Sequence, residues 1–132
     1  MASLCDLFYR AGVSSSFPAD ILELQVVEHG PVARVVTVVG EIDALTAPEL
    51  AACLTAQLNS AQVVVVDLDG VQFLASVGLH VLLEANELAK QEDRALLWVY
   101  NSETANLALE ATGLREYFTF AHSVAEALKD AP

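Results

Sequence analysis

Ser76 is the residue of this chain whose type and position best suit covalent chemistry. An apolar run at residues 63–68 precedes it, and Asp67, Asp69 and Gly70 are predicted to form an acidic turn that ends this run. Ser76 itself is the first residue of a helical pattern. Such a serine can cap the helix, because its oxygen accepts hydrogen bonds from unpaired N–H groups of the first turn. It can also be modified: a phosphoryl group would face the positive end of the helix and add about −1.5 to −2 charge. On the serine alone, both interpretations stay open.

A serine nucleophile is the third chemistry that this position could serve. Residues 74–78 join a predicted strand to a predicted helix, as the GxSxG elbow of serine hydrolases does, but Leu74 replaces the glycine that the strained elbow needs. The three histidines lie in unrelated segments without metal-ligand spacing, and the sequence contains neither GxxxxGK[ST] nor GxGxxG. We therefore expect no enzyme, no metal and no cofactor.

The composition excludes several kinds of partner. The chain has 132 residues, of which 55% are hydrophobic, and 18 acidic against 6 basic residues give a net charge of −12. This charge disfavours binding to nucleic acid or to anionic membranes, and it favours a basic protein partner. No apolar run approaches the roughly 18–20 residues that span a bilayer, and the N-terminus does not resemble a signal peptide. The expected place is the cytoplasm.

Residues 1–20 are predicted to be an N-terminal extension. Leu4, Leu7, Phe8 and Ala11 have the spacing of a short amphipathic helix. A frayed terminus is the alternative.

The two cysteines, Cys5 and Cys53, lie far apart and do not form a CxxC motif. A disulfide framework is therefore not expected. Cys53 is predicted to be a small buried apolar side chain, and a regulatory disulfide is the less favoured alternative.

The remaining residues, 21–132, alternate between strand-like and helix-like patterns. Strands are predicted at 21–28, 33–39, 63–68, 95–100 and 117–120, and helices at 47–59, 76–91, 102–111 and 123–129. The order β-β-α-β-α-β-α-β-α indicates one α/β domain with a mixed sheet of about five strands and about four helices, whose first two strands form an antiparallel hairpin.

Polar residues mark the ends of these helices. Thr46 with Glu49, and Ser123 with Glu126, have the spacing of capping boxes. Gly113 is a typical C-terminal stop for the helix at 102–111.

The helix at 76–91 has one face suited to the sheet. That face consists of Gly78, Val81, Leu82, Ala85 and Ala89. Leu79 and Leu83 fall toward the side of Ser76, where they would either join a partner surface or be covered by a neighbouring element.

Two segments together resemble a known family. DLDGVQFLASVGLHVLL, residues 67–83, resembles the STAS-domain signature, and in particular the pattern DLSGVxFMDSSGLGVLL of bacterial anti-sigma factor antagonists. The serine that follows the Asp in that pattern is the phosphorylated one, and an ungapped alignment places it at Ser76. GEIDALTAPEL, residues 40–50, resembles the family's GELDxxTAxxL, whose acidic turn lies beside the phosphorylation loop on the partner-binding face. The resemblance covers residues 21–128.

The resemblance implies a switch in bacterial transcription regulation. An anti-sigma factor, often a serine kinase that binds ATP itself, holds a sigma factor inactive. The unphosphorylated antagonist binds the anti-sigma factor and frees the sigma factor. Phosphorylation of Ser76 then dissolves the complex, and a phosphatase restores it. The chain would be a single STAS domain over residues 21–132, a monomer or weak dimer that needs no cofactor of its own.

The same resemblance, with the helix pattern above, implies a set of partner-binding residues. These are Glu41, Asp43, Thr46, Asp69, Ala75, Ser76, Val77, Gly78, Leu79 and Leu83.

The sequence departs from the family pattern on both sides of Ser76. Ala75 replaces the Asp that precedes the phosphorylated serine, and Val77 replaces the Ser or Thr that follows it. A kinase that positions its substrate through that Asp would lose a contact. The alternative function is therefore a non-phosphorylated STAS adaptor in a signalling assembly or a transporter complex.

Overall fold

The computed structural model describes residues 22–130, and these form the predicted order of elements with one short addition. The strands are β1 (Leu22–His29), β2 (Ala33–Ile42), β3 (Val63–Leu74), β4 (Ala95–Val99) and β5 (Phe120–Ala121), and the helices are α2 (Ala47–Ser60), α3 (Ser76–Gln91), α4 (Glu103–Thr112), the 3-10 helix η2 (Arg115–Tyr117) and α5 (Val124–Asp130). The predicted α/β class and the order β-β-α-β-α-β-α-β-α are confirmed. The extension predicted at residues 1–20, with its amphipathic helix, lies outside the described residues.

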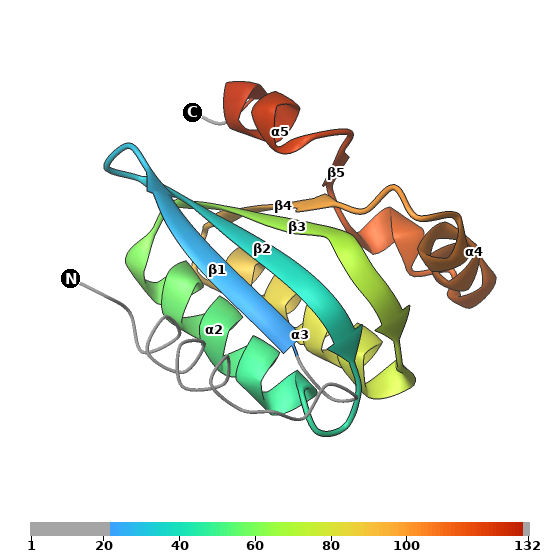
Figure 1. Ribbon diagram of the computed structural model, residues 1–132. Helices are drawn as coiled ribbons and strands as arrows, with labels where there is room; N and C mark the ends of the chain where they lie inside the picture. The colour runs from blue at the N-terminus through green and yellow to red at the C-terminus, as the bar shows by residue number, and fades with distance from the viewer. Residues whose placement is uncertain (1–21, 131–132) are drawn as a thin grey trace.

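The five strands form one mixed sheet in the order β1-β2-β3-β4-β5 (Figure 1). β1 pairs with β2 in antiparallel fashion, and the other neighbours are parallel. The hairpin between β1 and β2 turns at Gly30, whose φ of 73° lies in the left-handed region that glycine enters without steric cost. The predicted hairpin and mixed sheet are therefore confirmed.

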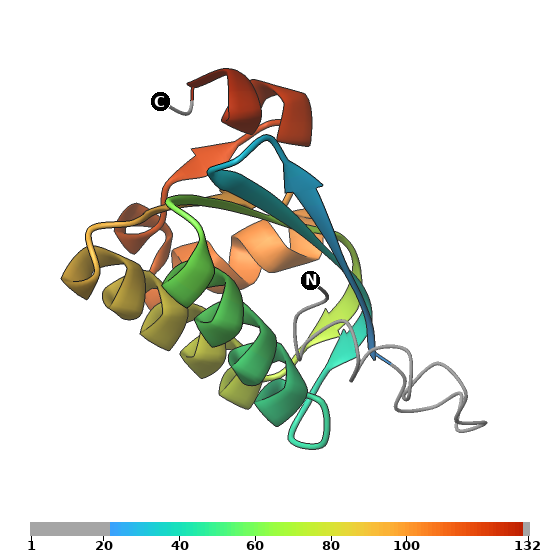
Figure 2. The ribbon, with the colours of Figure 1, turned by 90° about the vertical axis from the view of Figure 1, so that its left-hand side faces the viewer.

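Helices cover the two faces of the sheet unequally (Figures 1 and 2). α2 and α3 lie side by side on one face, and the main core forms between them and the sheet. α5 packs on the opposite face, where it contributes to a smaller second cluster. The run of four valines follows from this arrangement: Val64 and Val66 belong to the main core, and Val63 and Val65 belong to the second cluster. A strand that is covered on both faces needs apolar residues at every position.

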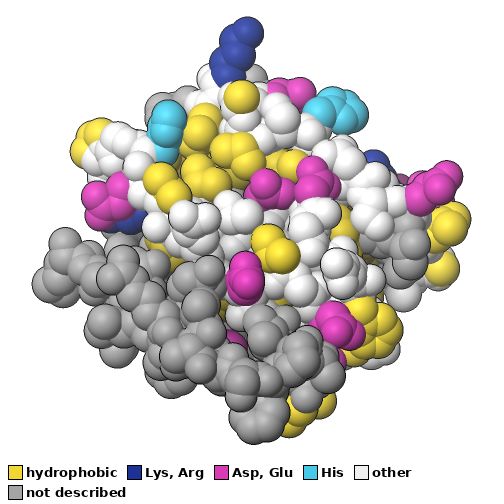
Figure 3. Space-filling model, viewed as in Figure 1, with side chains coloured by type: hydrophobic (Ala, Val, Ile, Leu, Met, Phe, Trp, Pro, Cys, Tyr) yellow, Lys and Arg dark blue, Asp and Glu magenta, His cyan; other side chains and the backbone are white. Residues whose placement is uncertain are grey.

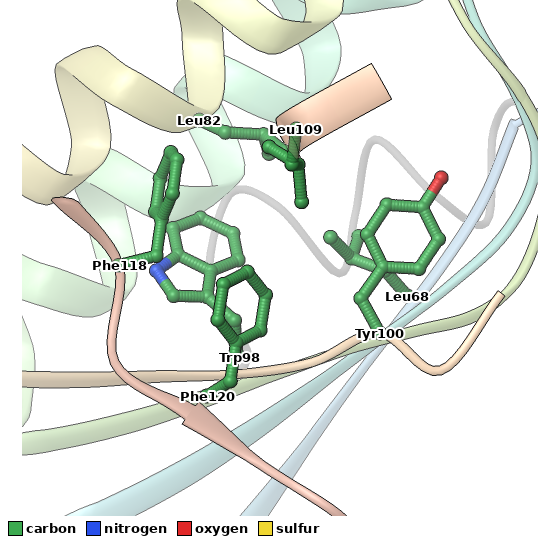
Figure 4. Close-up of a pocket in the computed structure, with 7 residues that line it drawn as sticks. All are labelled: Leu68, Leu82, Trp98, Tyr100, Leu109, Phe118 and Phe120. Carbon is green, nitrogen blue, oxygen red and sulfur yellow. The ribbon is translucent and has the colours of Figure 1, made fainter. Parts of the chain in front are cut away.

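An aromatic cluster closes the main core beneath α4 (Figure 4). The rings of Trp98 and Phe118 meet edge to face, with centroids 5.5 Å apart. The space enclosed around them has no room for a water molecule. Trp98 Nε1 is buried there without a hydrogen-bond partner among the described residues, which costs stability relative to a paired indole.

The predicted strand at 117–120 is wrong over its first three residues. Residues 115–117 form η2 instead, where Phe118 N–H donates to the carbonyl of Arg115, and β5 contains only Phe120 and Ala121. The turn carries Phe118 into the aromatic cluster. Asn86 Nδ2 donates to the carbonyl of Tyr117 at 2.6 Å, and this bond ties α3 to the turn.

Two helix ends occur where the sequence predicts them. Glu126 N–H donates to Ser123 Oγ at 3.0 Å, so Ser123 caps α5. Gly113, with φ of 72°, ends α4, and Leu114 N–H donates back to the carbonyl of Leu109.

Cys53 is fully buried in α2, as predicted, but it is not a free thiol. Its sulfur is disulfide-bonded, so the prediction of a free, small apolar side chain at Cys53 is wrong in this respect. Cys5 lies outside the described residues.

The predicted acidic turn after the valine run is wrong, because β3 continues through it to Leu74. The pairing with β2 shifts twice, between Thr37 and Val39 and between Gly40 and Glu41, and at each shift β3 carries one extra residue. Such bulges bend a strand and let it keep pairing. The side chain of Asp67 accepts a hydrogen bond from Asp69 N–H at the first shift.

Asp69 fastens this bulge to the end of β4. Its carboxylate accepts hydrogen bonds from Asn101 N–H at 2.7 Å and from Asn101 Nδ2 at 3.0 Å. Asn101 Nδ2 also donates to the carbonyl of His122, so one side chain joins three segments of the chain. Burial, and then the nearby charge of Asp69, raise the pKa of Tyr100 above its ordinary value.

Gly78 permits the close approach of α3 to β2. A Cβ at this position would lie 2.4 Å from Ile42 Cγ2 and 2.7 Å from Leu74 Cδ1. Ile42 is fully buried and has no room to move away. The sequence correctly predicts Gly78 on the sheet-facing side of α3.

Replacement of Gly78 by alanine should therefore destabilise the fold. We expect Gly78→Ala to lower the free energy of unfolding by about 1–2 kcal/mol, because overpacking costs about 1–3 kcal/mol and the better helix propensity of alanine returns at most about 1 kcal/mol. Urea denaturation of both proteins measures the difference.

A double-mutant cycle with Ile42→Ala is the control, since that change removes the clashing methyl group. The double variant should be less destabilised than the sum of the two single variants. Additivity within about 0.5 kcal/mol would contradict the steric explanation.

The raised pKa of Tyr100 predicts a specific loss of stability at alkaline pH. Its contribution is fully present below the unfolded-state pKa of about 10 and is lost as the pH rises through the higher folded-state pKa. Tyr100→Phe should reduce the fall of the unfolding free energy above about pH 10. Asp69→Asn should reduce it partly, because it removes the second cause of the shift. An identical alkaline slope in Tyr100→Phe and wild type would refute the assignment.

Candidate functional site

Parallel pairing of β2 and β3 brings the two family-like segments to one edge of the sheet (Figure 1). Glu41 pairs with Phe73, and Ile42 pairs with Leu74. Ala75 N–H then donates to the carbonyl of Ile42 at 2.8 Å. The start of α3, with Ser76, therefore lies directly beside the turn that follows β2.

That turn is held by its own side chains. Asp43 Oδ1 accepts hydrogen bonds from the N–H groups of Leu45 and Thr46, at 2.9 and 3.1 Å. Thr46 Oγ1 donates to the carbonyl of Glu41 at 2.8 Å and accepts from Asp43 N–H at 2.9 Å. These bonds make a compact turn whose shape does not depend on a partner.

The predicted capping box of α2 is wrong. Thr46 is the N-cap, but its backbone is helical rather than extended and its side chain makes no capping hydrogen bond. Its hydroxyl is already used within the turn. The described residues therefore show no reciprocal capping bond from Glu49 to Thr46. Burial raises the pKa of the Glu49 carboxyl group.

Ser76 is the first residue of α3 and does not cap it. Ala75 occupies the N-cap position with an extended backbone and has no side chain that could accept a hydrogen bond. The hydroxyl of Ser76 is exposed and has no hydrogen-bond partner among the described residues. The helix-cap interpretation of Ser76 is therefore wrong, and the hydroxyl is accessible to a modifying enzyme.

Three apolar side chains stand out from the surface around Ser76. Leu45 is 73% exposed, Phe73 is 53% exposed and Val77 is 40% exposed. Leu45 comes from the turn after β2, Phe73 from the end of β3 and Val77 from the first turn of α3. Figure 3 shows hydrophobic and acidic side chains together at the lower right edge, where Figure 1 places these ends. We call Leu45, Phe73, Val77 and Ser76 the Ser76 surface.

The partner-binding residues predicted from the sequence include Val77 but not Leu45 or Phe73. Both occur beside apolar residues that are buried, and their types alone do not distinguish an exposed side chain from a core one. Their position in the chain is the signal that could have identified them. Each residue lies in the last residues before a predicted helix, where the chain leaves the sheet.

The predicted partner-binding residues divide into those near this surface and those away from it. Glu41 and Asp43 lie half-buried beside it, and Ala75 adjoins it. Thr46, only 3% exposed, and Gly78 are buried, so they shape the surface from below. Asp69 is not brought to it, because its carboxylate is bound at the end of β4.

Leu79 and Leu83 are half-buried and pack against the main core. Of the two alternatives for these residues, coverage by neighbouring elements accounts for much of their surface. Only their remaining exposed part is available to a partner.

The described part of the chain shows no group of three or more His, Cys, Asp or Glu side chains that could hold a metal ion. Within residues 22–130, no helix is both long and apolar enough to cross a membrane.

Comparison with protein-family models identifies a STAS domain over residues 23–127. A comparison with curated protein sequences gives no match.

Solved structures with the same fold include several anti-sigma factor antagonists. The antagonist from Mycobacterium paratuberculosis is 32% identical, with a TM-score of 0.75, and the match covers 87% of this chain and 97% of that one. Phosphorylated SpoIIAA, the Bacillus cell fate determinant, is 16% identical, with a TM-score of 0.64 over 80% of this chain and 96% of its own. An anti-sigma-factor antagonist (STAS) domain protein from Planctomyces limnophilus is 19% identical, with a TM-score of 0.66 over 83% and 98% of the two chains.

The family match covers most of the chain, and the fold and the two segments at the Ser76 edge agree with it. This protein therefore belongs to the STAS-domain family.

Proposed function

We propose that this chain is an anti-sigma factor antagonist: it binds an anti-sigma factor through the Ser76 surface and so releases a sigma factor. Phosphorylation of Ser76 by a partner kinase ends the complex, and a phosphatase restores it. The observation that carries the proposal is the exposed, unbonded hydroxyl of Ser76 among exposed apolar side chains. The 32% identity to the mycobacterial antagonist supports the choice of partner.

The geometry at Ser76 suits a phosphoryl acceptor. The first N–H groups of an α-helix lack partners within the helix, so a phosphate on the first residue can accept hydrogen bonds from them and meets the positive end of the dipole. Phosphorylated SpoIIAA is a solved structure with this fold, which supports the same chemistry here. The chain is then the substrate of the kinase and supplies no catalytic group itself.

The physical effect of the phosphate falls on the partner. Binding would bury Leu45, Phe73 and Val77, and the hydroxyl among them, away from water. A phosphate adds about −1.5 to −2 charge, and burying it unpaired costs several kcal/mol. Since each 1.4 kcal/mol changes affinity tenfold, one phosphate is enough to empty a micromolar complex.

The surroundings of Ser76 also favour a protein partner of particular chemistry. Glu41 and Asp43 flank the apolar side chains, and the whole chain carries a net charge of −12. A partner with apolar residues inside a basic rim is complementary to this surface and is attracted to it over distance. The kinase, its ATP and the sigma factor all work in the cytoplasm, which is therefore the proposed place of action.

Ala75 and Val77 favour one alternative function, a STAS adaptor that binds its partner without phosphorylation. Ala75 is the N-cap of α3 and offers no carboxylate to a kinase. If the kinase of this system positions its substrate through an Asp at this place, Ser76 stays unmodified and the surface binds constitutively.

Substitution of Ser76 tests the switch. We expect Ser76→Ala to retain affinity for the anti-sigma factor, and Ser76→Asp and Ser76→Glu to weaken it at least about tenfold, because each places a charge in the docked surface. Titration calorimetry with candidate anti-sigma factors from the same genome measures these affinities.

Phosphopeptide mapping after incubation with ATP and each candidate provides the control. Phosphate should be found on Ser76 and not in Ser76→Ala, and Ala75→Asp should accelerate its incorporation if the missing carboxylate matters. Equal binding by wild type and all three Ser76 variants, together with absence of phosphate, would exclude the switch in favour of the adaptor.

Truncation of the exposed apolar side chains tests the surface. Leu45→Ala and Phe73→Ala should each weaken binding by about tenfold, as buried anchor residues do, while the unfolding free energy changes by less than about 0.5 kcal/mol because both side chains are exposed. Leu107→Ala on α4, 64% exposed, is the matched control and should bind normally. A loss of affinity as large in Leu107→Ala would place the interface elsewhere.

A further inference from the structure

A cavity lies away from the Ser76 surface, at the carboxyl ends of β4 and β5. It has a volume of about 300 Å³ and is bordered by the segment after β4, by α4 and η2, and by the start of α5. It shares no residue with the Ser76 surface. In open α/β sheets, crevices outside the carboxyl ends of parallel strands are where ligands bind, and this volume is at the lower end of the range for small-molecule sites.

Tyr100 gives this cavity a polar group with no protein partner. The residue is only 6% exposed, and its ring packs in the aromatic core. Figure 4 shows its hydroxyl pointing away from Trp98 and Phe118, and Tyr100 also lines the cavity. None of the described residues shares a hydrogen bond with this hydroxyl. The hydroxyl is not among the fully buried polar atoms that lack a partner, so solvent reaches it and it can donate to a molecule in the cavity.

Arg115 supplies the cation of the cavity. Its guanidinium lies 5.1 Å from the centre of the Phe120 ring, and it donates a hydrogen bond to Asn106 Oδ1. Among residues 22–130 it has no carboxylate within ion-pair distance, although acidic residues outnumber basic ones threefold in this chain. These contacts orient the guanidinium and leave donors for a bidentate carboxylate.

Acceptors come from the other side of the cavity. Asn101 uses both of its Nδ2 hydrogens on Asp69 and on the carbonyl of His122, so its orientation is set and its Oδ1 has no partner in the described part of the chain. Glu126, from the first turn of α5, also lines the cavity. The cavity therefore presents donors from Tyr100 and Arg115 and acceptors from Asn101 and Glu126.

We propose that this cavity binds a small zwitterion, in the simplest case an α-amino acid. Its carboxylate accepts hydrogen bonds from Arg115 and Tyr100, and its ammonium group donates to Glu126 and Asn101. A ligand without net charge suits this chain, because the net charge of −12 repels free phosphate or a simple carboxylate. The site is independent of the proposed antagonist function, and its test needs no anti-sigma factor.

The test is a titration of the isotope-labelled full chain with each of the twenty amino acids, followed by the amide resonances. Concentrations up to about 10 mM detect dissociation constants in the millimolar range. At least one amino acid should shift the resonances of Asn101, Arg115 and His122 in a saturable way. Its N-acetyl derivative, which lacks the ammonium group, and its methyl ester, which lacks the carboxylate, should each bind at least about tenfold more weakly.

Two variants connect the binding to this cavity. Arg115→Gln, an exposed position that should not affect folding, and Tyr100→Phe, which keeps the ring, should each weaken binding at least about fivefold, and Lys90→Gln on α3 should bind as wild type does. The proposal is overturned if no amino acid gives saturable shifts, or if both variants bind normally. Inorganic phosphate that binds as tightly as the best amino acid would overturn the zwitterion assignment.

Discussion

The close approach of α3 to β2 is the constraint on which the rest of this structure depends. The parallel pairing of β2 with β3 places Leu74 beside Ile42, and the next residue, Ala75, donates its N–H to the carbonyl of Ile42. α3 can begin there only because Gly78 has no Cβ to meet Ile42. The same contact sets the sheet-facing side of α3 and the place of Ser76 beside the turn after β2. Packing of the core and geometry of the candidate site therefore have one origin.

Much of this arrangement could be predicted from the sequence, because it follows from periodicity. The valine run predicts a strand covered on both faces, and the structure divides its side chains between the two clusters. The helical spacing correctly predicts Gly78, Leu82, Ala85 and Ala89 on the buried face of α3, whereas Val81, predicted with them, is only half-buried. The likeness of residues 40–50 and 67–83 to the family segments is borne out by the STAS match. Such patterns repeat over many residues, so one misleading residue does not change the result.

Features that depend on a single hydrogen bond or a single bulge could not be predicted in the same way. Thr46 has the type and spacing of a helix cap, yet its hydroxyl bonds within the turn to Glu41 and Asp43 instead. Asp69 reads as the end of a strand, yet a bulge absorbs it, and Asn101, 32 residues away, binds its carboxylate. Ser76 has the residue type of an N-cap, yet it is the first residue of α3 and the N-cap position belongs to Ala75. In each case the local preference is real, but a tertiary contact that the sequence does not display decides which hydrogen bond or helix position the residue takes.

The site geometry also explains why a phosphate on Ser76 would act on a partner rather than on the fold. The side chain extends into solvent from the first residue of α3 and has no hydrogen bond to lose. Asp43, in the turn after β2, is already held by the N–H groups of Leu45 and Thr46, so it has little freedom to rearrange. Unpaired N–H groups at the start of α3 offset part of the added charge locally. The unmodified surface and the phosphorylated one would then have the same shape and differ in charge. Phosphorylation would cost the domain little stability, and its effect would be the desolvation cost that the added charge imposes on binding of the partner.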